Sequence, residues 1–262
     1  MNQTKNGLWN SPLLRSQVTS EDVRPPEMLF GYLIGPFGAL LASGIFTSQL
    51  QNYLTNVLKL DLGFLTTLQL LSTILIVAAN LVVGQLIERT RTLAGKARPW
   101  ILLSALTLSV ASVLMFIVPF ADRTARMVWI AIAYNAYYAV GFPIYNTANS
   151  TLVPVSTRNS KQRSTLASLT NIASLGVMGV GSMIFPTLVS MALKEDQHLW
   201  FVAMLGVAIF TALTILLQFR FTRERVTEES AGAEKAEKSS ASLGEQRSEE
   251  RRVGKECLRL CR

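Results

Sequence analysis

The long apolar stretches of this sequence contain no aspartate, glutamate, lysine, arginine or histidine. Enzyme sites need acids, bases, nucleophiles or metal ligands, and ion pathways within membranes are usually marked by charged residues. The sequence therefore argues against an enzyme and against a proton relay in these stretches. Six stretches of spanning length share this property, at about residues 28–58, 62–87, 100–120, 127–155, 164–193 and 199–219.

Cysteine and histidine are almost absent. Cys257 and Cys261 lie within the last six residues, so the apolar part of the chain has no disulfide and no thiol nucleophile. His198 is the only histidine, and the tail has none to complete a metal site with the cysteines. We predict no metal site.

Apolar residues dominate what is present. They make up 50% of the 262 residues, charged residues make up 16%, and the mean hydropathy is +0.33. About 20 residues of helix cross the hydrocarbon core, and continuous runs of this length satisfy their backbone in lipid as helices. We predict an all-α membrane protein with six transmembrane helices.

The net charge of +8 comes from lysine and arginine residues beside the apolar stretches and in the tail. Thirteen of them flank the stretches on the side of the N-terminus, and four flank them on the other side. This bias predicts a multi-pass protein of the cell membrane with both termini in the cytoplasm. The cations indicate contact with the lipid bilayer and not with nucleic acid.

The sequence predicts four regions. Residues 1–27 are polar and resemble no cleavable signal peptide, so they form a cytoplasmic segment ahead of the bundle at 28–221. Residues 222–246 contain few large apolar residues and are predicted to be a flexible cytoplasmic linker. Residues 247–262 resemble the in-frame translation of a sequencing adapter, which predicts a non-native tail; a basic tail that contacts anionic lipid is the alternative.

Three motifs carry a family resemblance. They are GQLIERTRTLAGKARPWIL from Gly84, FGALLASG over 37–44 and TLVP over 151–154. Together they resemble the glycoside-pentoside-hexuronide:cation symporters, the melibiose-permease branch of the major facilitator superfamily. The resemblance covers residues 28–226. It implies the N-terminal six-helix bundle of a twelve-helix carrier, a sugar or glycoside as substrate, and a missing C-terminal half.

The first motif is predicted to be a cytoplasmic gating loop. Pro99 suits the first turn of a helix, and Gly95 permits the turn before it. The alternative is a loop that only anchors the chain by its positive charge. The predicted gating residues are Gly84, Glu88, Arg89, Arg91, Gly95, Lys96, Arg98 and Pro99.

The sequence departs from the family in its transport pathway. The resemblance places the carboxylates that bind sugar and cation in melibiose-type members at Leu40, Ile76, Asn80 and Asn146, and none of these is acidic. This half therefore does not support a coupling Na⁺ or H⁺, unless the missing half supplies the site, and we predict no other cofactor.

Neutral amides and aromatic rings remain as a predicted substrate lining. Amides exchange hydrogen bonds with sugar hydroxyls, and rings cover the apolar face of a pyranose. The alternative is that these side chains only bond neighbouring helices. The predicted lining is Asn80, Asn135, Tyr138, Phe142, Tyr145, Asn146, Asn149 and Ser150.

The sequence thus favours a secondary transporter of sugars or glycosides that works by alternating access between two bundles. Two alternatives stay open. One is a non-transporting membrane scaffold or degenerate half-carrier, and the other is a lipid or drug carrier on the same fold.

Overall fold

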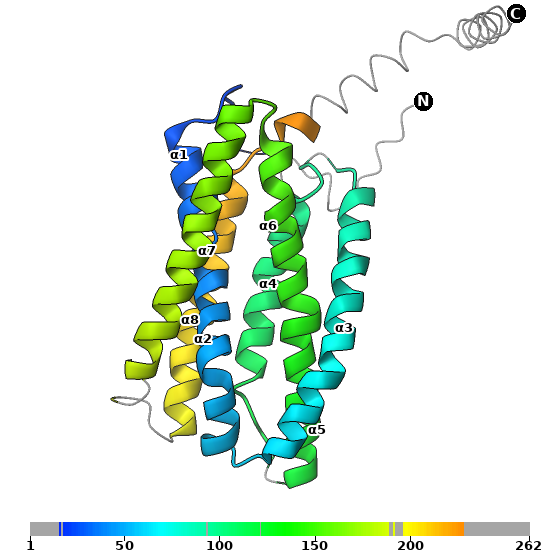
Figure 1. Cartoon of the computed structure of the whole chain (residues 1–262), viewed down its shortest axis with the longest axis vertical. Helices are drawn as coiled ribbons and strands as arrows, with labels where there is room; N and C mark the ends of the chain where they lie inside the picture. The colour runs from blue at the N-terminus through cyan, green and yellow to red at the C-terminus, as the bar shows by residue number, and fades with distance from the viewer. Residues whose placement is uncertain are drawn as a thin grey trace, which may run out of the picture.

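The computed structural model describes residues 16, 18–92, 94–120, 122–188, 191 and 196–227, and these contain helices and no strand. The helices form six rods that run side by side (Figure 1). This confirms the predicted all-α fold. The first rod consists of α1 (Pro25–Glu27), η3 (Met28–Ile34), α2 (Phe37–Asn52) and η4 (Tyr53–Val57). The second rod is α3 (Leu62–Arg89), the third is α4 (Arg98–Leu114), and the fourth consists of α5 (Arg123–Asn135), η5 (Ala136–Gly141) and α6 (Phe142–Ser156). The fifth rod is α7 (Ser160–Leu188), and the sixth is α8 (Gln197–Phe221).

Five of the six rods are long and apolar enough to cross a membrane, and α4 is shorter, with 17 residues. The sequence predicts that this third helix runs to residue 120, but it ends at Leu114. The indole nitrogen of Trp129 donates to the carbonyls of Leu114 (3.2 Å) and Ile117 (2.6 Å), so carbonyls at this end have a partner outside the helix. Pro119 follows, where a helix cannot continue normally.

Two rods are interrupted by wide helical turns. The first rod has a π-helical segment at Met28–Ile34, which ends two residues before Pro36, and the fourth has one at Ala136–Gly141, which ends two residues before Pro143. Proline removes one backbone donor and crowds the preceding turn, so irregular turns next to it are expected. Both rods still run as continuous columns (Figure 1).

Each helix has defined neighbours in the bundle. Helices α4 and α8 lie against each other, α2 packs on α8, and α6 packs on α4. Helix α7 lies against α2, and α3 lies against α6 and η5 (Figure 1). Helices α3 and α7 therefore lie at the edges of the bundle, and both are largely exposed along their spans.

A stripe of glycines brings the first rod close to α8. A β-carbon at Gly35 would lie 2.6 Å from Cβ of Gln218, and one at Gly38 would lie 2.3 Å from Oγ1 of Thr214. Hydrogen bonds join the two helices at this crossing: Gly38 N donates to Thr214 Oγ1 (3.2 Å), and Thr211 Oγ1 donates to Gly38 O (3.0 Å). Small residues permit such close helix crossings in membranes.

We call the end of the bundle that carries residues 90–97 and 222–227 the proximal end, and the end that carries residues 58–61 the distal end (Figure 1). Toward the distal end the core is aromatic. The rings of Tyr53 and Phe116 lie 4.6 Å apart, and Trp200 lies 5.2 Å from Tyr53. This core fixes α2, α4 and α8 relative to one another.

Candidate functional site

Two members of the predicted lining lie on the exposed face of α6. Asn146 and Ser150 are both exposed, and the Ser150 hydroxyl donates to the Asn146 carbonyl (2.8 Å). Asn80 is also exposed, on α3, and its amide donates to the carbonyl of Ile76 (2.8 Å). These three side chains therefore present amide and hydroxyl groups outside the packed core of this chain.

Two other members face the opposite way, into the bundle. Tyr145 and Asn149 are buried against α8, where both meet Gln218. The Tyr145 hydroxyl donates to Gln218 Oε1 (3.2 Å), and Gln218 Nε2 donates to Asn149 Oδ1 (2.7 Å). In this chain these polar groups join α6 to α8.

Gln218 was not among the predicted site residues. A signal was available, because Gln218 is the only amide in the last apolar stretch. An amide in an otherwise apolar span needs an internal partner.

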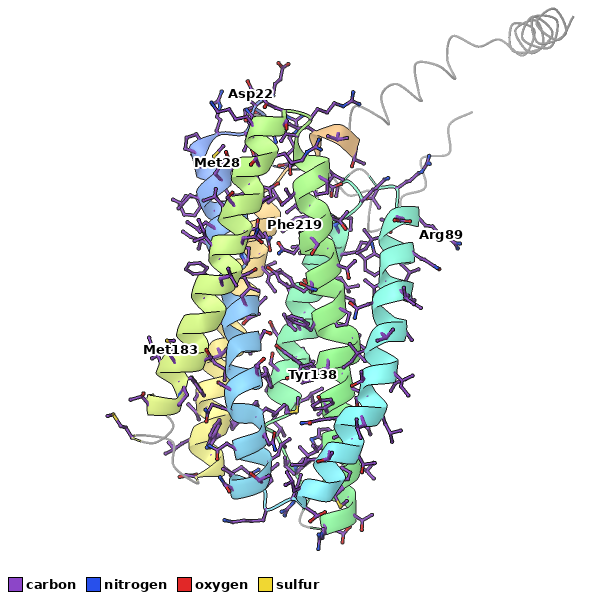
Figure 2. The ribbon with its side chains drawn as sticks, in the orientation of Figure 1. Asp22, Met28, Arg89, Tyr138, Met183 and Phe219 are labelled. Carbon is purple, nitrogen blue, oxygen red and sulfur yellow. The ribbon has the colours of Figure 1, made fainter. Side chains whose placement is uncertain are left out.

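The last three members of the lining lie on the rod of α5, η5 and α6, part-way into the core. Asn135 donates to the carbonyl of Ala131 (2.9 Å), and its Oδ1 is buried without a hydrogen-bond partner among the described residues. The ring of Tyr138 (labelled in Figure 2) lies 4.6 Å from that of Tyr134, and Phe142 stacks on Tyr137 at 6.2 Å. The predicted lining is thus divided between the core and the exposed face.

The predicted gating loop is built around Glu224, which follows α8. Its carboxylate accepts from the backbone nitrogens of Lys96 (2.7 Å), Ala97 (2.8 Å) and Arg98 (2.8 Å). These nitrogens belong to the start of α4, where helical N–H groups have no partner within the helix. A negative charge at a helix N-terminus is also favoured by the helix dipole. Glu224 therefore caps α4 from a distant part of the chain.

Gly95 makes room for this carboxylate. Its φ of +106° is one that side chains rarely adopt. A β-carbon at Gly95 would lie 2.4 Å from Cδ of Glu224, so glycine is needed for both reasons. The glycine of the motif thus follows from a contact that is remote in sequence.

Arg98 is buried behind the cap. Its guanidinium donates to the carbonyls of Phe219 (2.9 Å) and Ala94 (3.3 Å) and lies 4.6 Å from the centroid of the Phe219 ring. Pro99 occupies the first turn of α4, as predicted. The indole of Trp100 donates to Thr90 Oγ1 (2.9 Å). The second half of the motif is therefore folded onto the ends of α3 and α8.

The first half of the motif is different. Glu88, Arg89 and Arg91 are exposed, and Figure 2 shows Arg89 pointing away from the bundle. A β-carbon at Gly84 would meet nothing within 4 Å. The predicted gating residues thus separate into a set packed within this chain and a set presented to its surroundings.

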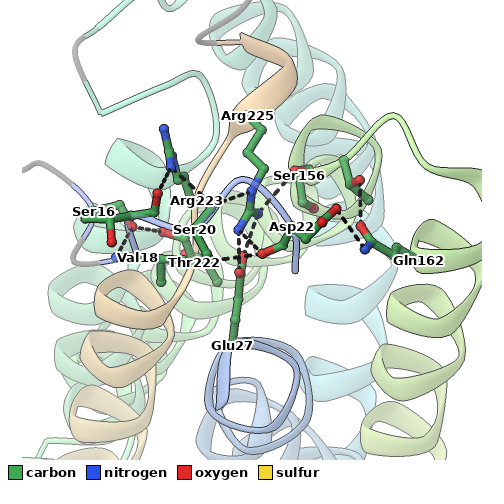
Figure 3. A network of polar contacts seen from close by, with 12 residues as sticks. Ser16, Val18, Ser20, Asp22, Glu27, Ser156, Gln162, Thr222, Arg223 and Arg225 are labelled. Atoms are coloured by element: carbon green, nitrogen blue, oxygen red, sulfur yellow. Dashed lines mark hydrogen bonds and ion pairs between the residues drawn. The ribbon is translucent and has the colours of Figure 1, made fainter. Parts of the chain in front are cut away.

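A second polar network ties the N-terminal segment to the end of α8 (Figure 3). Arg225 and Glu27 form a buried ion pair at 2.7 Å, and Arg225 also donates to the carbonyls of Asp22 (3.2 Å) and Ser156 (3.4 Å). Gln162 at the start of α7 donates to the Asp22 carboxylate (3.3 Å).

This network extends the packed region beyond α8. Residues 222–227 lie within the segment that the sequence assigns to a linker, but Thr222, Glu224 and Arg225 are buried. The described part of the bundle therefore continues to Thr227. Residues 228–262, which include the predicted adapter-like tail, lie outside the described residues.

The described residues contain no group of three or more His, Cys, Asp or Glu that could hold a metal ion. Within them, the buried carboxylates Glu27 and Glu224 are held by a guanidinium and by backbone nitrogens. The polar chemistry of the α6 face is thus neutral.

Comparison with known proteins agrees with this architecture. The family model described as MFS/sugar transport protein matches residues 31–251. The chain belongs to this family. The match confirms the resemblance drawn from the loop motif.

Several curated proteins are similar to the chain. The isoprimeverose transporter of Lactiplantibacillus pentosus is 26% identical over 218 residues, which are 80% of this chain and 44% of that protein. The putative glycoside/cation symporter YagG of Escherichia coli (strain K12) is 28% identical over 177 residues, 67% of this chain and 38% of that protein. The uncharacterized symporter YjmB of Bacillus subtilis (strain 168) is 25% identical over 222 residues, 82% of this chain and 46% of that protein. The chain spans less than half the length of these relatives.

Proposed function

We propose that this chain is the N-terminal half of a secondary transporter of sugars or glycosides. A second six-helix bundle would complete the carrier, and the substrate would bind between the two bundles during alternating access. The proposal is supported by the family match over residues 31–251 and by the names of the similar proteins.

The observation that carries the proposal is the exposed polar face of α6. Asn146 and Ser150 lie in a spanning helix, yet the packing of this chain leaves them uncovered. A polar side chain in a membrane span is unfavourable toward lipid, so it usually faces a bundle interior or a water-filled cavity. An amide and a hydroxyl on such a cavity wall would exchange hydrogen bonds with sugar hydroxyls.

We assign the predicted lining two proposed roles. Asn80, Asn146 and Ser150 are the proposed substrate contacts. Tyr145 and Asn149 support them, because their bonds to Gln218 fix the rotation of α6 about its axis. Tyr138 and Phe142 would add ring surface at the edge of the core.

We also propose that the proximal end lies in the cytoplasm of a cell whose plasma membrane holds the carrier. The support is the excess of lysine and arginine beside that end. In this orientation Glu88, Arg89 and Arg91 would meet the second bundle or the lipid headgroups on the cytoplasmic side.

Cation coupling would depend on the second bundle. The proposed contacts in this half are neutral, and the two buried carboxylates among its described residues, Glu27 and Glu224, have partners at the proximal end. We therefore propose that any Na⁺ or H⁺ site uses carboxylates outside this chain.

The test is sugar uptake by the full-length carrier in membrane vesicles. Asn146→Leu is expected to lower uptake of a glycoside at least tenfold, because the loss of a hydrogen bond to a sugar leaves its hydroxyl unpaired. Ser150→Ala is expected to have a smaller effect in the same direction.

The matched control is Asn56→Leu, which removes an exposed amide near the distal end. It should leave uptake unchanged. Normal uptake by Asn146→Leu and by the Asn80→Leu/Asn146→Leu double variant would remove the support for a substrate path on this face. It would favour a non-transporting scaffold instead.

A further inference from the structure

A polar pocket of about 520 Å³ opens at the distal end of the bundle. It lies where the loop between η4 and α3 meets the start of α5. It is separate from the α6 face and from the loop motif. Its lining is Thr55, Leu58, Lys59, Leu60, Asp61, Leu62, Arg123 and Arg126.

The pocket concentrates positive charge on a side that otherwise has little of it. The sequence places only four lysine and arginine residues between helices on the distal side, and three of them line this pocket. The fourth, Lys194, lies outside the described residues. Separate anchoring residues would be scattered over this face, whereas these three come together from two segments of the chain.

Lys59 occupies an unusual backbone position. Its φ is +53°, and it is the only non-glycine residue with positive φ in the described part of the chain. It ends the first rod, with Leu60 N donating back to Leu54 O (3.0 Å). Glycine is the usual residue at such a helix end, and another residue there costs about 1–2 kcal/mol.

A cation at a helix C-terminus has a modest local benefit from the helix dipole. That benefit explains a basic residue at Lys59, but it does not bring two arginines from α5 to the same place. Arg126 also fixes this turn, because its Nη1 donates to the carbonyl of Leu58 (3.1 Å). This hydrogen bond joins the turn at Lys59 to the start of α5, so the three basic side chains line the same pocket.

Two nearby acids cap the starts of helices. Asp61 lines the pocket and accepts from Phe64 N (3.3 Å) at the start of α3. Asp122 accepts from Ala125 N (3.0 Å) at the start of α5. Each carboxylate is therefore directed at a helix N-terminus, whose partial positive charge it offsets.

We propose that this pocket binds a phosphate-bearing anion. Lysine ammonium and arginine guanidinium groups are the usual protein ligands of phosphate, because they form charge-assisted hydrogen bonds with its oxygens. The pocket lies at the end of the spanning rods, which is the level of lipid headgroups. The phosphate of an anionic phospholipid and free phosphate share this chemistry.

The test uses the full 262-residue chain in a nonionic detergent, with the midpoint of thermal unfolding as readout. A ligand that binds only the folded protein raises this midpoint, and the rise grows with the ratio of its free concentration to its dissociation constant. Short-chain phosphatidylglycerol, short-chain phosphatidylcholine and inorganic phosphate are titrated separately. We expect phosphatidylglycerol to raise the midpoint at concentrations where phosphatidylcholine does not.

The variants are Arg123→Gln and the double variant Lys59→Asn/Arg123→Gln. Asparagine is used because it tolerates positive φ. The double variant is expected to need about tenfold more phosphatidylglycerol than the unchanged chain for the same shift. Lys161→Gln removes one exposed cation at the proximal end and is expected to behave like the unchanged chain.

Each result decides the proposal. A shift by phosphatidylglycerol alone supports a lipid headgroup, and an equal shift by inorganic phosphate supports a soluble anion at the same site. If no anion shifts the midpoint, or if Lys161→Gln weakens the shift as much as Arg123→Gln, the proposal is overturned. If the double variant does not fold, Arg123→Gln alone gives the answer, because Arg123 is exposed.

Discussion

At the scale of single residues, Glu224 and Gly95 depend on each other. The carboxylate takes three backbone N–H groups of the loop before α4, and the missing side chain of Gly95 leaves the space for it. Glu224 also accepts from Thr227 Oγ1 (3.0 Å), and the Gly95 carbonyl accepts from Thr92 Oγ1 (2.8 Å). A substitution at either residue tests this dependence through its effect on stability.

Gly95→Ala is expected to destabilise the chain by about 1–3 kcal/mol, because alanine at a φ of +106° is strained and its β-carbon would meet Glu224. Thermal unfolding in detergent measures this. Gly84→Ala is the control: Gly84 lies inside α3 with open space around it, so alanine should leave stability unchanged or raise it by up to about 1 kcal/mol. Equal losses in both variants would contradict the prediction.

Glu224→Gln keeps the size of the side chain but removes its charge and one acceptor oxygen. We expect a loss of about 1–3 kcal/mol in unfolding free energy, because buried N–H groups of the loop would lose their partner. Glu88→Gln, at an exposed carboxylate of the same motif, should change stability by less than about 0.5 kcal/mol. A neutral result for Glu224→Gln would mean that water replaces the cap.

At the scale of helices, close packing depends on residues that have no side chain. The first rod is irregular before Pro36, where its π-helical turns lie, and its backbone groups at Gly38 bond to two threonines of α8. These bonds are possible only because the rod and α8 approach closely at Gly35 and Gly38. The irregular turn and the glycine stripe therefore form one structural feature.

Gly38→Ala is expected to destabilise the bundle by about 1–3 kcal/mol, because the new methyl group would lie 2.4 Å from Cα of Thr211. The midpoint of thermal unfolding measures the change. Gly206→Ala, within α8, is the matched control, since a β-carbon there meets nothing within 4 Å. A larger loss at Gly206 than at Gly38 would show that the helices do not cross here as described.

At the scale of the whole molecule, the proximal end is held together by segments far apart in the sequence. Arg225 bonds the N-terminal segment through Glu27 and Asp22 and bonds the end of α6 through Ser156. Glu224 bonds the start of α4. Two adjacent residues thus connect three of the helical rods to the end of α8, which favours motion of this bundle as a unit.

Glu27→Gln is expected to cost about 3–5 kcal/mol, because it leaves the Arg225 guanidinium buried without its carboxylate. The double variant Glu27→Leu/Arg225→Met should recover part of this loss, since neither buried charge remains. Glu21→Gln, at an exposed acid of the same segment, is the control. If the unfolding free energy of the double variant were lower than that of Glu27→Gln, the two buried charges would not act as a pair.

Much of the architecture could be predicted from the sequence. The helices and their approximate limits follow because lipid forces every backbone group in a span to bond within its own segment. The loop motif predicted the family, which the match over residues 31–251 confirms. The predicted end of the third helix near residue 120 was wrong, because the helix ends at Leu114, whose carbonyl accepts a hydrogen bond from Trp129 in the next rod.

The candidate site was less predictable. The sequence predicted Tyr145, Asn146 and Asn149 as parts of one lining, but the packing of α6 against α8 buries Tyr145 and Asn149 and leaves Asn146 exposed. Gln218 lies 69 residues from Asn149, and no local pattern specifies such a pair. Which polar groups remain exposed for a substrate is therefore a property of helix packing.

The sequence by itself determined that this protein is helical, membrane-spanning and related to sugar carriers, because hydrophobic length and loop composition are local properties of the chain. The tertiary structure alone decided the roles within the motif. Gly95 and Arg98 serve a cap and a packing contact made by residues 219–224, whereas Glu88 and Arg89 remain outside. These roles depend on contacts between distant segments, and such contacts exist only once the bundle has formed.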